Sequence, residues 1–452
     1  MTDIRADDPL RRVATSERIV ALDVLRGIAI LFILVLNIPL MGGYASLEVF
    51  DPRIVSWTAA DQATFVGLGM FLDGTQRGLL EVLFGAGVMI MTRRAMQPDG
   101  PVSVADLHYR RNLWLIAFGL FHAFVLMWPG DILFAYGIAA LFVFPFRRLA
   151  PRTKALIGAV FIIAVIAPGV ARYAERVELK ADAATIQAKV KAGKVATKAE
   201  TETLDEWKKK VERQVPVARN KEKQEAVAKE KKARLGPLPG YAEALAGVWA
   251  NFNVGSFMYF GFFEIFGTML LGMAVYEWGV LQGRARTGAY VAMVVLGYGF
   301  GATARYFADL EALRFTPDPK IGWMTWDLAR IALVFGHIGL VNLALRSGIG
   351  QRLLSVFQAP GRMPLTIYFS ASVLCMWILF PGVGFGLFGQ FGWAGLAAIA
   401  LAIIAGQVVF ANVWMAAFES GPVDWLWKSL AYWKRQPFRK QARSGEALAA
   451  AE

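Results

Sequence analysis

The chain has 452 residues, of which 56% are hydrophobic and only 18% are charged. Soluble domains carry about 45–50% apolar and about 25% charged residues, so this composition argues against a soluble protein. The formal net charge of +13 would suggest nucleic acid as a partner of a soluble protein, but basic cytoplasmic loops are the simpler cause in a membrane protein. With one cysteine and three histidines, no intramolecular disulfide can form and a zinc site is not expected.

Many nearly uncharged stretches are long enough to cross a bilayer core of about 30 Å as helices. We therefore predict an all-α, polytopic helical membrane protein with about ten transmembrane helices. The expected spans are residues 20–41, 74–93, 110–128, 131–149, 153–173, 254–279, 286–306, 325–346, 363–381 and 393–415. No cleavage site of small residues follows the first apolar run, so we interpret it as a retained helix rather than a signal peptide.

The connections between these spans alternate in charge. Basic connections at 94–111, 146–154, 283–286 and 346–362 are separated by connections with few or no basic residues. Because cytoplasmic loops of membrane proteins are enriched in lysine and arginine, this pattern places both termini in the cytoplasm.

One segment differs from the rest in composition. Residues 172–240 contain eighteen lysine and arginine residues against eleven acidic ones. Thr197 and Glu200 form a capping-box pattern, and Gly193 could end an earlier helix. We expect a charged helical hairpin on the periplasmic side, with a solvated linker as the alternative, followed by an interfacial helix at 241–253. The predicted organisation is a first bundle half (1–173), this insert (174–240), a second bundle half (241–430) and a basic cytoplasmic tail (431–452).

Two residues near the outer ends of the third and fourth spans are candidate catalytic groups. His122 lies within an apolar run, and Asp131 follows Trp128-Pro129-Gly130. An ionisable residue inside a membrane is costly and is a functional-site hypothesis by default. His122 could act as a general base towards an acceptor hydroxyl, with Asp131 orienting it. The alternatives are a histidine that packs between helices and an aspartate that caps the fourth span.

A polar stripe is expected on the second span. Asp73, Arg77 and Glu81 are spaced four residues apart, so on a helix they would share one face. Such a face cannot contact lipid, and it indicates a polar cavity that opens outward and receives the acceptor. The other polar residues that we assign to this cavity are Asn37, Glu264, Arg305 and Arg330.

Basic residues at the cytoplasmic edges are candidates for donor binding. Asp23 and Arg26 are three residues apart at the mouth of the first span and could pair with each other. Alternatively, the forked donors of an arginine could hold the phosphates of a cytoplasmic donor. Arg110, Arg111 and Arg362 are assigned to the same donor site, and snorkelling to the interface is the alternative account of all three.

Several long motifs resemble those of a known family. They are RIVALDVLRGIAILFILVLNIP at 18–39, LLEVLFGAGV at 79–88, RRNLWLIAFGLFHAFVLMWPGDILFAYG at 110–137, GRMPLTIYFSAS at 361–372 and GPVDWLWKSLAYWKRQPFRK at 421–440. Over nearly its whole length the chain resembles the YeiB-like family of bacterial inner-membrane proteins, which implies a multi-pass protein of that membrane. The insert at about 175–240 looks longer than usual for the family, so the resemblance supports no function for it.

The LDVLRG motif is also similar to that of heparan-α-glucosaminide N-acetyltransferases and integral-membrane sugar O-acyltransferases. This resemblance implies a transmembrane acyltransferase that moves an acyl group, such as acetyl, from cytoplasmic acyl-CoA to an outer acceptor. Acyl-CoA would be a co-substrate, and we expect no covalently bound cofactor and no metal. The expected partners are the bilayer, acyl-CoA and an envelope glycan, lipid or small molecule, with a homodimer as a further candidate and no nucleic acid. A transporter or flippase and a non-enzymatic membrane scaffold are the alternative functions.

Overall fold

The computed structural model describes residues 19–44, 51–92, 102–254 and 256–440. Helices dominate these ranges, and the only β pairing within them is an isolated antiparallel bridge between Phe418 and Arg439. Our predictions for the start of the first bundle half, for part of the connection at 94–111 and for the end of the tail fall on residues outside these ranges.

The helices follow one another along the chain in three groups. The first group contains α1 (Val20–Gly42), α2 (Ala59–Phe71), α3 (Thr75–Thr92), α4 (Val102–Phe124), α5 (Leu133–Val143) with the 3₁₀ turn η3 (Phe144–Arg148), and α6 (Pro151–Lys191). The insert contains α7 (Lys198–Glu212), η4 (Val217–Arg219) and α8 (Lys221–Leu235). The last group contains α9 (Leu238–Val254), α10 (Ser256–Glu277), α11 (Thr287–Leu313), α12 (Gly322–Ala344), α13 (Gly348–Ser355), α14 (Gln358–Arg362), α15 (Pro364–Val373), the π-helical η5 (Leu374–Leu379), α16 (Trp393–Ala417) and α17 (Pro422–Tyr432).

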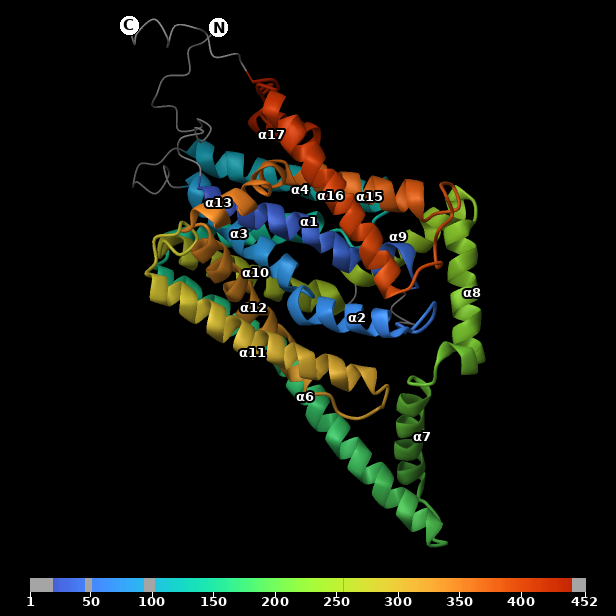
Figure 1. Cartoon of the computed structure of the whole chain (residues 1–452). Helices are drawn as coiled ribbons and strands as arrows, with labels where there is room; N and C mark the ends of the chain where they lie inside the picture. The colour runs from blue at the N-terminus through green and yellow to red at the C-terminus, as the bar shows by residue number, and fades with distance from the viewer. Residues whose placement is uncertain (1–18, 45–50, 93–101, 255, 441–452) are drawn as a thin grey trace, which may run out of the picture.

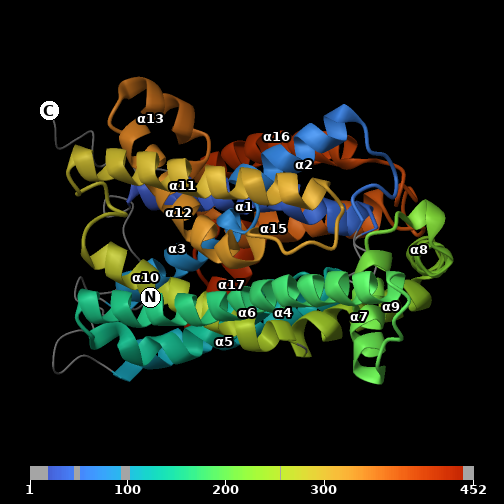
Figure 2. The ribbon, with the colours of Figure 1, turned by 90° about the horizontal axis from the view of Figure 1, so that it is seen from below.

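The all-α, polytopic class predicted from the sequence is confirmed. Within the described ranges a helix lies at each of the ten predicted spans. Five helices there are both long and apolar enough to cross a membrane, namely α1, α6, α11, α12 and α16. They run lengthwise across the view in Figure 2, and Figure 1 shows α6 and α16 inclined to α1 and α11. The fourth predicted span forms α5, whose 11 residues are fewer than the roughly 20 that a perpendicular crossing needs.

The insert begins inside a membrane-length helix. Helix α6 is continuous over 41 residues, so the predicted boundary at 173 falls within one helix. Figure 1 shows its second half projecting beyond the bundle, with α7 returning beside it. Gly193 adopts φ +78° after the end of α6, and Thr197 and Glu200 form both hydrogen bonds of the predicted capping box. A salt bridge of 2.7 Å from Lys189 to Glu200 joins the two arms, so the insert is a helical hairpin rather than an irregular linker.

Two sequence motifs that are far apart in the chain meet at a helix crossing. Gly27, the last residue of LDVLRG in α1, faces Gly361 of the GRMP motif in α14. A Cβ atom at Gly27 would lie 1.9 Å from the carbonyl oxygen of Phe357, and one at Gly361 would lie 1.8 Å from that of Asp23. Only glycine permits this backbone approach. The crossing brings the basic residues of both motifs to the same end of the bundle.

Candidate functional site

A chain of hydrogen bonds joins a serine, a histidine and an aspartate in the core. His122 lies in the last turn of α4, Asp131 precedes α5, and Ser372 lies on α15. The distance from His122 Nδ1 to Asp131 Oδ1 is 2.7 Å, and from His122 Nε2 to Ser372 Oγ it is 2.8 Å. His122 and Ser372 have no exposed surface. The two predicted catalytic residues are therefore in direct contact, and a third residue joins them.

The direction of these bonds follows from the chemistry of the groups. A carboxylate only accepts, so the bond between His122 Nδ1 and Asp131 requires a proton on Nδ1. In the uncharged tautomer with that proton, Nε2 accepts from the Ser372 hydroxyl. The second oxygen of Asp131 accepts from the Phe134 amide at 2.8 Å, so Asp131 also caps the first turn of α5. The orienting and capping interactions that we considered for Asp131 are both present.

Aromatic side chains of α15 hold the imidazole ring in place. Phe369 stacks on His122 with the ring centroids 4.7 Å apart and the planes 2° apart, and the Tyr368 centroid lies 4.5 Å from it. Trp128 donates to the Tyr368 hydroxyl at 3.0 Å. Tyr368 and Ser372 were not predicted as site residues, because uncharged side chains do not stand out within an apolar helix. The GRMPLTIYFSAS motif, which ends at Ser372, was the only indication.

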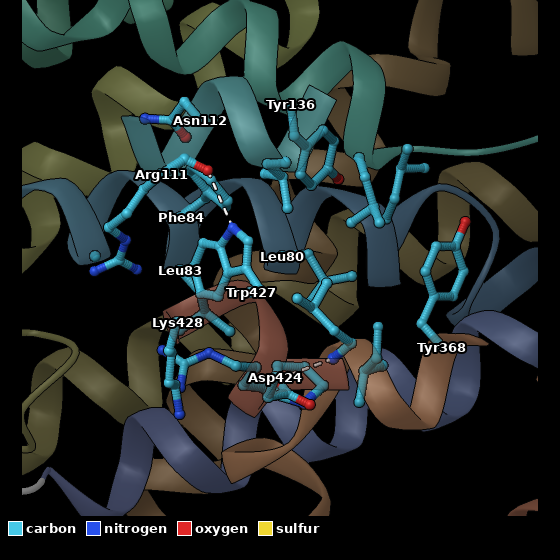
Figure 3. A pocket seen from close by; sticks show the side chains of 18 of the residues that line it. Leu80, Leu83, Phe84, Arg111, Asn112, Tyr136, Tyr368, Asp424, Trp427 and Lys428 are labelled. Atoms are coloured by element: carbon cyan, nitrogen blue, oxygen red, sulfur yellow. Dashed lines mark hydrogen bonds between the residues drawn. The ribbon is translucent and has the colours of Figure 1, made fainter. Parts of the chain in front are cut away.

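A cavity of about 270 Å³ lies beside this cluster. Its walls come from α1, α3, α4, α5, α14, α15 and α17 and are largely apolar, with Leu80, Leu83, Phe84, Leu115 and Leu133 among the lining residues. Tyr136 and Tyr368 line its inner part, and Figure 3 shows Arg111 and Lys428 on the side opposite Tyr368. Tyr368 therefore separates the cavity from His122.

Three of the predicted donor-binding arginines line this same cavity. The four lysine and arginine residues in its wall are Arg26, Arg111, Arg362 and Lys428. The carboxylate in the wall, Asp424, accepts hydrogen bonds from Leu365 and Thr366 at the start of α15. Burial raises the pKa of Asp424, against the opposing effect of Lys428. One side of the cavity wall is therefore cationic, and the rest of the wall is largely apolar.

The other two predicted donor residues lie outside the wall. Asp23 pairs with Arg26 at 3.3 Å, as the helical spacing indicated, and Arg26 also donates to the Gly361 carbonyl oxygen. Arg110 pairs with Asp106 at 2.7 Å and lies over the Trp433 ring. Arg26, Arg111 and Arg362 thus line one cavity, whereas Arg110 lies outside its wall.

Four of the residues assigned to the acceptor cavity form a compact ion network. Arg330 pairs with Glu81 at 3.0 Å and with Glu264 at 3.1 Å, and Arg77 pairs with Glu264 and lies 3.7 Å from Glu81. The network joins α3, α10 and α12, and the Tyr136 hydroxyl reaches Glu81 at 3.4 Å. None of its four charged residues lines the cavity just described. Their role in binding an acceptor stays a prediction.

The predicted polar stripe is wrong at Asp73. Helix α3 begins at Thr75, so Asp73 lies in the turn before it and does not share a face with Arg77 and Glu81. It accepts instead from Arg305 at 3.1 Å and from Trp326 at 3.0 Å. Gly74, with φ +66°, makes this turn. Asn37 is half-buried in α1, and no hydrogen bond within the described ranges links it to the network.

Comparisons with known proteins support the YeiB-like resemblance. A family described as "Protein of unknown function (DUF418)" matches residues 275–434. The chain is 28% identical to "Uncharacterized protein YxaH" of Bacillus subtilis (strain 168), over 96% of this chain and 99% of that protein. It is 26% identical to "Uncharacterized protein YeiB" of Escherichia coli (strain K12), over 92% and 96% respectively. No solved structure matches significantly.

Proposed function

We propose that this chain is a transmembrane acyltransferase, in which Ser372, His122 and Asp131 act as nucleophile, general base and orienting carboxylate. The observation that carries this proposal is the hydrogen-bond chain from Ser372 Oγ through His122 to Asp131. Serine, histidine and aspartate in this order and polarity perform acyl transfer on several unrelated folds. The choice of an acyl donor also draws on the resemblance of LDVLRG to acyltransferase motifs.

The cavity has the chemistry of an acyl-CoA site. Arginine binds phosphate through paired donors, and Arg26, Arg111 and Arg362 all line the cavity. Beyond them the apolar interior suits the thioester arm and acyl chain, which carry no charge. The basic end would face the cytoplasm of a bacterial inner membrane, with both termini on that side, in accordance with the positive-inside rule.

The proposed reaction has two steps. The Ser372 oxygen attacks the thioester carbonyl carbon while its proton passes to His122 Nε2; the C–S bond then breaks, and the CoA thiolate leaves with that proton. This forms an acyl ester on Ser372. An acceptor hydroxyl then gives its proton to His122 and attacks the ester, which releases the acylated acceptor and restores the Ser372 hydroxyl. Asp131 holds the ring in the required tautomer in both steps.

Access to the serine requires a movement of Tyr368. Its side chain lines the cavity and also packs on His122, so the acyl group reaches Ser372 only when this ring turns away. The π-helical segment η5 begins at Leu374, directly after α15. Such π-helical segments are frequent at functional sites, and their hydrogen bonds differ from the regular α-helical pattern. We infer that the end of α15 is the part of the site that adjusts.

The test uses purified full-length protein in lipid nanodiscs with acetyl-CoA labelled in the acetyl group. We expect transfer of label to the protein, and to an acceptor when an envelope glycan and lipid extract is present. Ser372→Ala and His122→Gln should abolish both, with at least about a 10³-fold loss of rate. Ser370→Ala is the matched control, because this serine lies on the same helix and donates to the Ile367 carbonyl oxygen. Absence of any transfer by the wild type, or full activity in Ser372→Ala, contradicts the proposal.

The same cavity supports a second candidate function, a transporter or flippase. A wall that is cationic on one side and otherwise apolar also suits an anionic amphiphile that is carried without covalent change, and the buried ion network could take part in its coupling. Translocation of a labelled anionic lipid in vesicles, unchanged by Ser372→Ala but abolished by Arg26→Gln, would establish this function in place of acyl transfer.

A further inference from the structure

A second, smaller cavity lies where α6 leaves the bundle and meets the insert. Its volume is about 150 Å³. Helix α6 crosses the start of α12 here, since a Cβ atom at Gly169 would lie 1.9 Å from the Trp323 carbonyl oxygen. The lining residues are Arg172, Arg176, Lys210, Arg213, Gln214, Thr316, Lys320 and Trp323. Five of these eight side chains are cationic, and none is a carboxylate.

Three carboxylates act on the cations of this cavity from nearby without lining it, and each has a partner. Asp318 pairs with Lys180 at 2.6 Å, and Glu311 accepts from the amide of Ile321 at 2.8 Å. Glu206 lies 3.3 Å from Lys210, so one of the five cations has a partner on its own helix. The remaining positive charge faces the cavity without matching acidic groups in its wall.

The guanidinium groups are held in position by neutral neighbours. Arg172 lies 4.3 Å from the Trp323 ring centroid and Arg176 5.2 Å from it, and Arg176 donates to the Pro317 carbonyl oxygen at 2.7 Å. Lys320 is half-buried, and its burial, with the charges of Arg172 and Arg176, lowers its pKa against the opposing effect of the Glu311 and Asp318 carboxylates. Like charges held this close repel one another, and an anion between them would relieve the repulsion.

We propose that this cavity is a binding site for a phosphate group. Arginine forks and lysines recognise phosphate through charge-assisted hydrogen bonds, and Gln214 and Thr316 add neutral polar groups to the wall. The cavity lies at the end of the fifth predicted span, the level at which lipid headgroups meet a membrane protein. The phosphate comes from an anionic lipid headgroup or from a free phosphate compound. This site is separate from the proposed acyl-transfer site and does not depend on it.

The experiment uses the full-length protein in nanodiscs and two probes. In discs made only of phosphatidylcholine, inorganic pyrophosphate is titrated by calorimetry. In discs that contain phosphatidylglycerol, the lipid retained by the protein is measured by native mass spectrometry. We expect saturable, salt-sensitive binding of at least one probe. Binding of pyrophosphate alone identifies a free phosphate compound, and retention of phosphatidylglycerol alone identifies a headgroup.

Two matched double variants separate a built site from general positive charge. Arg172→Gln with Arg176→Gln should weaken binding at least roughly tenfold, because it removes charged hydrogen-bond donors from the wall. Lys208→Gln with Lys209→Gln removes the same charge from exposed positions of α7 and should leave binding unchanged. Arg176→Lys keeps the charge but loses the fork, so we expect an intermediate affinity. Equal losses in both double variants, or no saturable binding of either probe by the wild type, would overturn the proposal.

Discussion

Replacing Arg330 with methionine removes the central cation of the buried ion network. Arg330 is fully buried. It donates to Glu81 at 3.0 Å and to Thr268 Oγ1 at 3.2 Å, and it lies 3.1 Å from Glu264. Methionine fills much of the same apolar volume, so the substitution changes charge more than packing.

The size of the effect follows from the charges that remain. Without Arg330, the Glu81 and Glu264 carboxylates share one cation, Arg77, and Asp327 loses the guanidinium that lies 3.6 Å from it. Breaking a buried ion pair on one side costs roughly 3–5 kcal/mol, because it leaves an uncompensated charge. Adding Glu81→Leu leaves the Arg77–Glu264 pair balanced, with only the partly exposed Asp327 without Arg330, and replacing both partners of a buried pair by apolar groups is often nearly neutral. The double variant should therefore recover most of the loss.

Stability is measured as the unfolding free energy in detergent micelles, followed by tryptophan fluorescence. Lys180→Gln is the control, since its pair with Asp318 is about half exposed, at 51% and 41%. We expect that control to change stability by less than about 1 kcal/mol. A single variant as stable as the wild type, or a double variant no better than the single, would refute the view that charge balance holds α3, α10 and α12 together.

Three further predictions concern stability. Gly27→Ala places a methyl group 1.9 Å from the Phe357 carbonyl oxygen and should lower the free energy of unfolding by about 1–3 kcal/mol. Gly406→Ala, with open space around it, should not lower it. Equal shifts of the melting temperature in the two variants would contradict the close helix crossing at Gly27. Asp61 accepts from Ser56, Thr58 and the Ala394 amide, and these bonds outweigh burial and lower its pKa to about 2. Asp61 should raise the free energy of unfolding by about 1–2 kcal/mol above pH 5, and this contribution should be lost as the pH falls through 2. Asp61→Asn should therefore lose stability at pH 7 and lose much less at pH 2; a pH-independent difference would be evidence against this role. Thr197→Ala removes one bond of the capping box and should weaken hydrogen-exchange protection in α7 by about 1 kcal/mol, leaving α11 unchanged.

The class and the helix positions could be predicted because long apolar runs leave few other structures in a membrane. The continuation of α6 from the predicted span into the insert could not be predicted. The sequence changes from apolar to charged near Arg172, which indicates the end of a span, but the residues that follow are good helix formers and the helix continues to Lys191. Asp73 shows a similar limit, because periodicity cannot detect that a helix begins two residues later, after the Gly74 turn.

Part of the candidate site could also be predicted from the sequence. Charged and titratable residues in apolar runs stand out, so His122, Asp131, Arg26 and Glu81 could all be singled out. Ser372 could not, because a serine in a helix carries no such signal and its bond to His122 spans 250 positions in sequence. Long-range contacts of this kind are set by helix packing, which single-sequence patterns do not report.

The central claim is that Ser372 carries the acyl group, and intact-mass analysis tests it most directly. Wild-type protein incubated with acetyl-CoA and no acceptor, then quenched in acid, should show one added acetyl group, located on Ser372 by fragmentation. Ser370→Ala should show the same adduct, and Ser372→Ala should show none. An acetyl group on His122 or on any residue other than Ser372 would contradict the account. Transfer to an acceptor with no acetylated protein at any stage would contradict it as well.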